Sequence, residues 1–269
     1  MIETNNFDLA LSNQANQRAP LQPKTPLRSF FLPGARTSAR LVRTLPAYSM
    51  TIGTCDDGLP FVLDLQDPTA GPVLVSGDAG SGKTALLRLM VSSAMQLNSP
   101  REAQFVIFSP FLDEWDDLIE AGTQSGHCLG AYTGQEREAG QMILELSALA
   151  DQRRDEELSS PAILLVMDDF TPLLSAGFDV QVNLHWLLNQ GSLSRIWPIV
   201  AINAGWALNL HYWIDVFRTR LLGKIQSAAI GQKIAIHPGV ATQVLRAGVQ
   251  FTTWVDERWM RFWMDSRES

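Results

Sequence analysis

The sequence has 269 residues, of which 46% are hydrophobic and 18% are charged. This composition excludes a protein that is disordered throughout, and the chain is long enough to bury a sizeable hydrophobic core. The two cysteines, Cys55 and Cys128, lie far apart and outside any C-x-x-C spacing, so the sequence suggests neither a disulfide framework nor a structural zinc site. No apolar run reaches the roughly 18 to 20 residues that span a bilayer. The first residues, MIETNNFD, lack the pattern of a secretory signal. We therefore expect no transmembrane segment and a cytoplasmic location.

Charge divides the chain into two parts. Residues 1–46 contain six Lys and Arg against Glu3 and Asp8, a net charge of +4, and the remaining residues carry −11. A body this acidic excludes a protein that coats nucleic acid over its whole surface, so a nucleic acid would have to meet a local strip. The basic, proline-containing arm is typical of a linker or a partner-binding tail. We predict an arm over 1–46 and one folded domain over 47–269.

The first predicted elements are a hairpin over 48–66, around the turn Asp57-Gly58, a buried strand over 71–77 and a helix over 83–97. Further buried strands are predicted over 103–109, 162–170 and 196–203, with helices over 111–122, 136–158 and 181–191. A fifth strand is expected at 219–226, and a terminal hairpin around Asp256-Glu257. The alternation predicts an α/β fold with a mostly parallel sheet flanked by helices.

The strongest motif is a phosphate-binding loop between the strand over 71–77 and the helix over 83–97. It matches G-x-x-x-x-G-K-[ST] with Gly77, Asp78, Ala79, Gly80, Ser81, Gly82, Lys83 and Thr84, and Ala85 continues into the helix. Glycines let backbone N–H groups converge on phosphate oxygens, and the helix N-terminus adds positive potential. Lys83 is expected at the β- and γ-phosphates and Thr84 at Mg²⁺. The motif predicts a nucleoside triphosphate site.

Two carboxylates end the apolar strand AILLVM. Asp168 is expected to hold the Mg²⁺ shell, and Asp169 to orient or deprotonate the attacking water. The alternative is that the pair simply ends a strand at the surface, and the phosphate loop upstream favours the functional interpretation.

Other candidate residues depend on the position of neighbouring strands. Asn203 closes the strand PIVAIN, where it would either sense the γ-phosphate or act as an ordinary turn residue. Arg195, Arg218 and Arg220 are candidates for an arginine that acts on a neighbouring subunit's site, against the alternative of ordinary surface charge. The four histidines show no metal-ligand spacing, and the tryptophans are interpreted mainly as packing residues.

Over about residues 50–264 the sequence resembles the FtsK/HerA superfamily of translocase ATPases, and more closely its FtsK/SpoIIIE branch. The likeness rests on IGTCDDGLPFVLDLQ before the glycine loop, ALADQRRDEE before the Asp strand, SRIWPIVAIN, FRTRLLGKIQ and the closing hairpin. The resemblance implies a RecA-like core, ATP and Mg²⁺ as cofactors, and a hexameric ring that moves a polymer, usually duplex DNA. It also places Arg195 and Arg220 where the family has arginines, which makes them the better candidates for the trans role.

The sequence departs from this family at several positions. Asp168-Asp169 replaces the usual Asp-Glu, Asn203 replaces Gln, and IFSPFLDE stands where the branch has Asp-Pro-Lys. A shorter carboxylate retracts from the water, and a misplacement of about 1 Å can cost roughly 100-fold in rate.

The leading hypothesis is a DNA-translocating ring ATPase. The alternatives are a weakly hydrolysing or non-hydrolysing assembly subunit, and a protein-moving motor of a secretion system whose arm docks to a membrane partner. A small-molecule kinase fits the closing hairpin poorly.

Overall fold

The computed structural model describes residues 45, 47–154 and 160–264. The strands are β1 (Ser49–Cys55), β2 (Pro60–Asp64), β3 (Val73–Gly77), β4 (Ala103–Phe108), β5 (Cys128–Tyr132), β6 (Ala162–Asp168), β7 (Ile196–Asn203), β8 (Thr219–Leu222), β9 (Gln250–Val255) and β10 (Arg258–Trp263). The α-helices are α3 (Lys83–Leu97), α4 (Asp116–Ser125), α5 (Arg137–Arg154), α6 (Phe178–Gln190), α7 (Ala204–Ala207), α8 (His211–Ile214) and α9 (Ala228–Ala235).

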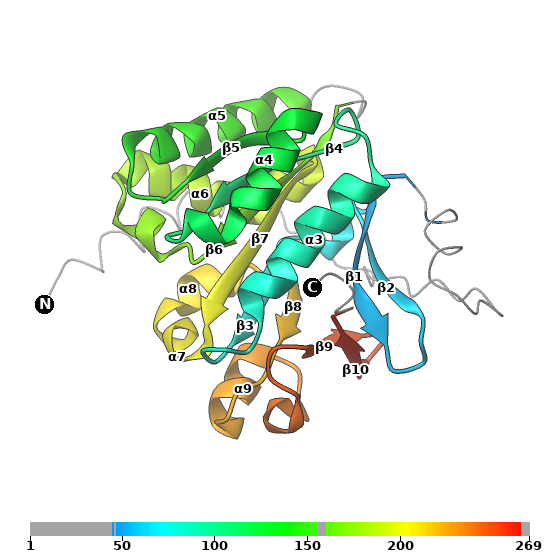
Figure 1. The fold of residues 1–269 in the computed structure, drawn as a ribbon. Helices are drawn as coiled ribbons and strands as arrows, with labels where there is room; N and C mark the ends of the chain where they lie inside the picture. The colour runs from blue at the N-terminus through cyan, green and yellow to red at the C-terminus, as the bar shows by residue number, and fades with distance from the viewer. Residues whose placement is uncertain (1–44, 46, 155–159, 265–269) are drawn as a thin grey trace, which may run out of the picture.

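All these strands belong to one sheet, with the order β2-β1-β10-β9-β8-β3-β7-β6-β4-β5. The six strands from β8 to β5 pair in parallel, so their carboxyl ends share one edge. The other four strands extend the sheet in antiparallel fashion, and β10 pairs with β1, which joins the two ends of the domain. Figure 1 shows β1 and β2 beside β9 and β10 at one end of the molecule.

Helices cover both faces of the sheet. On one face α3 and α4 pack over a core that includes Leu86, Leu87 and Val75, and α3 lies across the sheet in Figure 1. On the other face α5 and α6 enclose a second core that includes Ile143 and Leu184. The parallel strands are buried on both faces, which explains why they read as continuous apolar runs in the sequence.

The mixed α/β fold, the phosphate-loop helix, the two hairpins and the buried strands in their order along the chain were predicted, and the structure confirms them. The order of the strands within the sheet was not predicted. Strand β5 was missed because it is short and contains Gly130. Helices α7, α8 and α9 were also missed, since two of them have only four residues. The predicted arm over 1–46 lies almost wholly outside the described residues.

Within the described ranges, no helix is both long enough and apolar enough to cross a membrane. Over the same ranges, no group of three or more His, Cys, Asp or Glu side chains is arranged to hold a metal ion.

Candidate functional site

The phosphate loop links the carboxyl end of β3 to the first turn of α3. Gly80 (φ +71°) and Gly82 (φ +92°) adopt left-handed backbone conformations, which glycine reaches without steric cost. The loop folds back so tightly at Gly77 that a Cβ there would lie 2.3 Å from the hydroxyl of Ser81. The glycine spacing of the motif is therefore required by the shape of the loop.

Two later segments of the chain support this loop from outside. The Asp78 N–H donates to the carbonyl of Lys224 (2.9 Å), and the Asp78 carboxylate accepts the N–H of Gln226 (2.8 Å). The N–H of Gly248 donates to the carbonyl of Ser81 (3.2 Å). These contacts join residues more than 140 positions apart, and no local sequence pattern indicates them.

The groups that face the loop suit a polyphosphate. Among the described residues, the N–H groups of Ala79 and Gly80 make no backbone hydrogen bond, and both residues are exposed. The Lys83 ammonium donates to the carbonyls of Gly77 (3.1 Å) and Asp78 (3.0 Å). Burial lowers the pKa of Lys83, and the nearby carboxylate of Asp168 opposes that shift. A phosphate anion would supply the negative charge that favours this buried ammonium.

Thr84 and Asp168 meet across the edge of the sheet. The Thr84 hydroxyl donates to Oδ1 of Asp168 at 3.1 Å, so the two groups expected to serve one metal ion are adjacent. Burial raises the pKa of Asp168, while the hydrogen bond from the Thr84 hydroxyl favours its charged form. An oxygen pair of this kind is the donor type that Mg²⁺ binds, which fits the expected cofactor.

Asp169 is exposed and has a left-handed backbone, with φ +81°. Its Oδ1 accepts the N–H of Thr171 at 2.9 Å and also the Thr171 hydroxyl. The carboxylate thus closes the turn that begins the short helix Thr171–Ser175. This contact occupies one of its two oxygens, and the other is available to a water molecule.

Asn203 lies at the carboxyl end of β7, between the strand that carries the phosphate loop and the strand that carries Asp168. In the register of the sheet it is directly opposite Gly77. Its Oδ1 accepts the N–H of Gly205 at 3.0 Å and caps α7. The side-chain NH2 group of Asn203 is the part that can donate to a phosphate.

The structure buries two of the three candidate arginines. Arg195 is 5% exposed, precedes β7 at the edge opposite the phosphate loop, and packs over the ring of Tyr48 at 4.3 Å. Arg220 is 6% exposed and donates to the carbonyls of Phe217 (3.2 Å), Ile214 (2.8 Å) and Ile234. Both guanidinium groups are buried within this chain, so their placement gives no support to the trans role, which stays a prediction. Arg218, the third candidate, is exposed.

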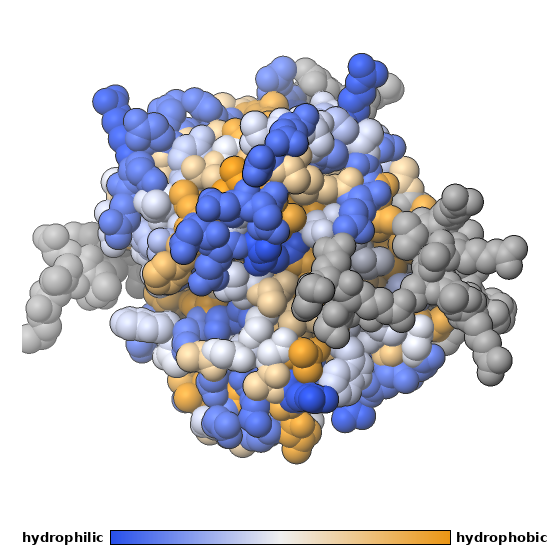
Figure 2. All heavy atoms as spheres, in the orientation of Figure 1, coloured by the Kyte–Doolittle hydropathy of each residue, from blue (hydrophilic) through white to orange (hydrophobic). Residues whose placement is uncertain are grey.

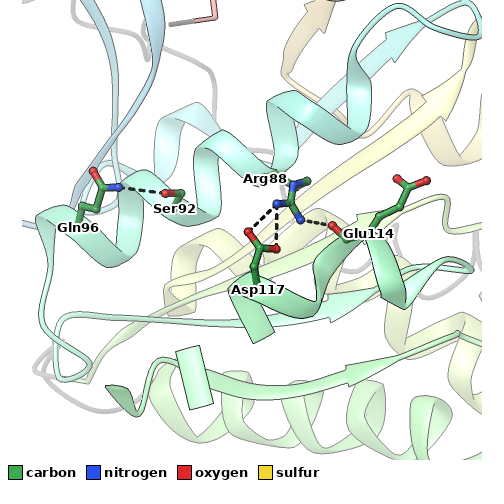
Figure 3. Close-up of polar contacts among 5 residues, drawn as sticks. All are labelled: Arg88, Ser92, Gln96, Glu114 and Asp117. Atoms are coloured by element: carbon green, nitrogen blue, oxygen red, sulfur yellow. Dashed lines mark hydrogen bonds and ion pairs between the residues drawn. The ribbon is translucent and has the colours of Figure 1, made fainter. Parts of the chain in front are cut away.

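Arg88 joins the phosphate-loop helix to the segment after β4. Its guanidinium makes two hydrogen bonds to the Asp117 carboxylate, at 2.8 and 2.9 Å, and a third to the carbonyl of Glu114 (Figure 3). The Arg88 guanidinium also lies 5.9 Å from the ring centroid of Trp115, which is fully buried between these two residues in the sequence. The sequence pattern of this acidic segment predicts a helix, but it contains no sign of the contact with Arg88. The surface over α4 is largely hydrophilic (Figure 2).

No protein-family model and no curated protein matches the sequence. Solved structures do match its fold. EccC of Thermomonospora curvata (ATPases 2 and 3, in complex with a signal sequence peptide) is 19% identical, with a TM-score of 0.64 over 84% of this chain and 43% of that chain. EssC (ATPases 2 and 3) of Geobacillus thermodenitrificans is 14% identical, with a TM-score of 0.63 over 94% of this chain and 49% of that chain.

The pCW3 conjugation coupling protein TcpA is a further match, 14% identical, with a TM-score of 0.59 over 81% of this chain and 66% of that chain. This chain has the fold of these ATPases. The predicted α/β architecture, with a phosphate loop between a strand and a helix, is thereby confirmed. The chain spans less than half the length of the matched EccC and EssC chains. In this EccC-like fold the phosphate loop, Asp168 and Asn203 lie together at the carboxyl edge of the parallel strands.

Proposed function

We propose that this protein binds ATP with Mg²⁺ and hydrolyses it. The observation that carries the proposal is the hydrogen bond between Thr84 and Asp168, because it puts a hydroxyl and a carboxylate together beside a loop shaped for phosphates. The fold of known ATPases supports the same reaction.

Each residue then has a defined task. The backbone of Gly77 to Gly82 and the Lys83 ammonium bind the phosphate oxygens, and Thr84 and Asp168 hold the metal ion. The ion supplies charge neutralisation on the phosphates. Asp169 orients the attacking water with its free carboxylate oxygen and accepts its proton. The amide of Asn203 donates to the γ-phosphate from the neighbouring strand.

A turnover assay tests this proposal. Steady-state ATP hydrolysis at fixed Mg²⁺ is measured for the wild-type chain and for Lys83→Ala, with Lys233→Ala as a matched control because Lys233 is an exposed lysine at the end of α9. We expect Lys83→Ala to lose turnover and Lys233→Ala to keep it. Wild-type turnover in Lys83→Ala would overturn the proposal.

We also propose that the protein acts as a ring, by analogy a hexamer, that moves a polymer, with DNA as the leading substrate. Support comes from a fold shared with a conjugation coupling protein and from the order of the motifs. Duplex DNA is expected to stimulate turnover. The stimulation should weaken when salt rises from about 50 to 200 mM, because phosphate contacts are salt-dependent. Stimulation that does not change with salt would exclude phosphate contacts as its main source.

One observation favours a slower enzyme as the second candidate function. The Asp169 carboxylate is engaged by Thr171, and it is one methylene shorter than the Glu that is usual in the resembled family. Asp169→Glu separates the two functions. A large gain in turnover would identify a weakly hydrolysing assembly subunit, whereas a loss would show that Asp169 already serves catalysis.

A protein-moving motor of a secretion system remains the third candidate. The EccC structure that shares this fold contains a signal sequence peptide, which supports a polypeptide substrate. Affinity purification of the full chain distinguishes the candidates. Recovery with a membrane protein, together with turnover insensitive to DNA, would favour the secretion motor and would suit docking through the arm over 1–46.

A further inference from the structure

One buried hydrogen-bond donor beside the candidate metal ligand has no acceptor in this structure. The side chain of Trp115 is fully buried in the short helix that follows β4, and its indole N–H makes no hydrogen bond to any described residue. Most buried N–H groups in proteins are paired, because burying a donor without an acceptor costs its desolvation free energy. The unpaired N–H of Trp115 therefore calls for a functional explanation.

The pairing of the strands brings Trp115 to the nucleotide site. Strand β4 pairs with β6 so that Phe108 is opposite Met167, and the chain that follows β4 therefore starts at the level of Asp168. Asp168 is two positions after Val166, which packs in the same core as Trp115. Side chains alternate along a strand, so Asp168 and Val166 point to the same face. Trp115 and Asp168 thus lie on the face of the sheet that α3 covers.

Helix α3 contacts both side chains. The Thr84 hydroxyl donates to Oδ1 of Asp168 at 3.1 Å. About one turn further along α3, the Arg88 guanidinium lies 5.9 Å from the centroid of the Trp115 ring. Arg88 also holds the segment that carries Trp115, through the hydrogen bonds drawn in Figure 3. The helix that begins at the phosphate loop therefore fixes the indole beside the carboxylate.

Asp168 has an oxygen that can accept from this donor. Among the described residues, Oδ2 of Asp168 accepts no hydrogen bond, since Thr84 donates to Oδ1 alone. Burial raises the pKa of Asp168, and the Thr84 hydroxyl and the Trp115 indole both oppose that shift. The indole thus acts on the carboxylate even though its N–H is unpaired in this structure. An unpaired buried donor and an unpaired acceptor lie close together.

We propose that Trp115 is a positioning residue for Asp168. Its indole N–H donates to Oδ2 of Asp168 once nucleotide and Mg²⁺ are bound, and this hydrogen bond keeps the carboxylate charged and turned toward the metal ion. Removal of such a donor behind a metal ligand typically lowers metal affinity by about 10- to 100-fold. The inference rests on the proposed ATP and Mg²⁺ site but not on hydrolysis, because Trp115 acts through Asp168 alone.

A pair of tryptophan variants tests the proposal. Trp115→Phe keeps an aromatic ring and removes the N–H. The matched control is Trp197→Phe, because Trp197 is also fully buried in the same core and its indole N–H is also unpaired within the described chain. Trp197 is opposite Leu164, four residues before Asp168 on β6, so it lies roughly 13 Å further toward the amino ends of the parallel strands.

Binding of a non-hydrolysable ATP analogue is measured by equilibrium dialysis over a series of Mg²⁺ concentrations and in EDTA. We expect Trp115→Phe to need about tenfold more Mg²⁺ than the wild-type chain for half-maximal binding, with unchanged affinity in EDTA. Trp197→Phe should keep the wild-type Mg²⁺ midpoint, although both variants lose stability. A wild-type midpoint in Trp115→Phe, an equal shift in both variants, or weaker binding of Trp115→Phe in EDTA would overturn the proposal.

The indole proton provides a readout that a packing role would not move. In heteronuclear NMR spectra of the wild-type chain, the Trp115 Nε1–H resonance is identified by its absence from Trp115→Phe, or through its own backbone amide should that variant not fold. We expect this resonance to move downfield when Mg²⁺ and the analogue are added together, and to stay in place with the analogue in EDTA. A resonance that does not respond to Mg²⁺ would overturn the proposal.

Failure of the proposed ATP site gives a different result. A wild-type chain that does not bind the analogue, or binds it without any dependence on Mg²⁺, would overturn the ATP and Mg²⁺ site and the role of Trp115 with it. Mg²⁺-dependent binding by wild type with an unchanged midpoint in Trp115→Phe would overturn the role of Trp115 alone.

Discussion

At the scale of single residues, the two adjacent carboxylates at the end of β6 have different environments. Asp168 is mostly buried against Thr84, whereas Asp169 is exposed and turned toward Thr171. Asp168 is therefore the candidate metal ligand, and its neighbour Asp169 is the candidate base. The left-handed backbone of Asp169 is a conformation that Asp and Asn tolerate better than most residues.

Asp169→Asn should separate catalysis from folding. The amide oxygen can still accept the N–H and hydroxyl of Thr171, and Asn adopts the left-handed backbone, so the unfolding free energy should change little. The side chain can no longer take a proton, and turnover should fall roughly 10²-fold or more. Hydrolysis and urea unfolding are measured on the same preparation. Full turnover in this variant would remove Asp169 from the catalytic assignment.

Asp168 should make stability depend on pH. Burial raises its folded-state pKa above the ordinary 3.8, so between the two values the folded state binds more protons than the unfolded state. Stability from this group is therefore greatest below the ordinary pKa and falls as pH rises through the folded-state pKa. In magnesium-free buffer, Asp168→Asn should be more stable than wild type at neutral pH, and the difference should shrink toward acid. Exposed Asp113→Asn is the control, and an identical pH dependence in both variants would contradict the expectation.

At the scale of elements, Arg220 connects β8 to the helices packed beside it. Its donors reach the carbonyls of Ile214 at the end of α8 and Ile234 in α9. Burial lowers the pKa of Arg220 to about 10, which still leaves the guanidinium charged at neutral pH. Arg220 therefore stabilises the packing of α8 and α9 against β8.

Arg220→Ala should reduce the free energy of unfolding by roughly 2–4 kcal/mol, because buried carbonyls lose their donors. The neighbouring Arg218→Ala, at an exposed position, should change it by less than about 0.5 kcal/mol. Chemical denaturation of both variants measures the difference. A loss of turnover in Arg220→Ala without a loss of stability would instead restore its assignment as an arginine that acts between subunits.

The elements were predictable where a local pattern determined them. The phosphate-loop helix was predicted with the bounds that the structure shows, since its apolar residues recur at helical spacing after a glycine loop. Asn203 was expected to close its strand, and the register of the sheet places it opposite Gly77. The support of the loop by Lys224 and Gly248, and the burial of Arg195 and Arg220, depend on contacts distant in sequence, so no local pattern contains them.

At the scale of the whole molecule, the site is assembled from distant parts of one sheet. The phosphate loop follows β3, its partners follow β6 and β7, and its supports come from the residues after β8 and before β9. A ligand at the phosphate loop therefore contacts a structure that forms only when most of the sheet has formed.

Nucleotide binding should accordingly stabilise the entire domain. At a concentration 100 times its dissociation constant, ATP with Mg²⁺ should add about 2.7 kcal/mol to the free energy of unfolding. The gain should disappear in Lys83→Ala and when Mg²⁺ is removed with a chelator. Thermal unfolding with and without nucleotide checks this. Equal stabilisation of wild type and Lys83→Ala would place the nucleotide somewhere other than the phosphate loop.

The pairing of β10 with β1 brings the first and last described strands of the domain together in the sheet. Thr54 is opposite Trp263, so the first and last described strands lie side by side and their outer ends are only a few residues apart along the sheet. Copies of such a unit can follow one another in one polypeptide with short connections, and a circularly permuted chain needs only a short linker across the old ends. The four antiparallel strands β1, β2, β9 and β10 therefore make the domain suited to tandem duplication.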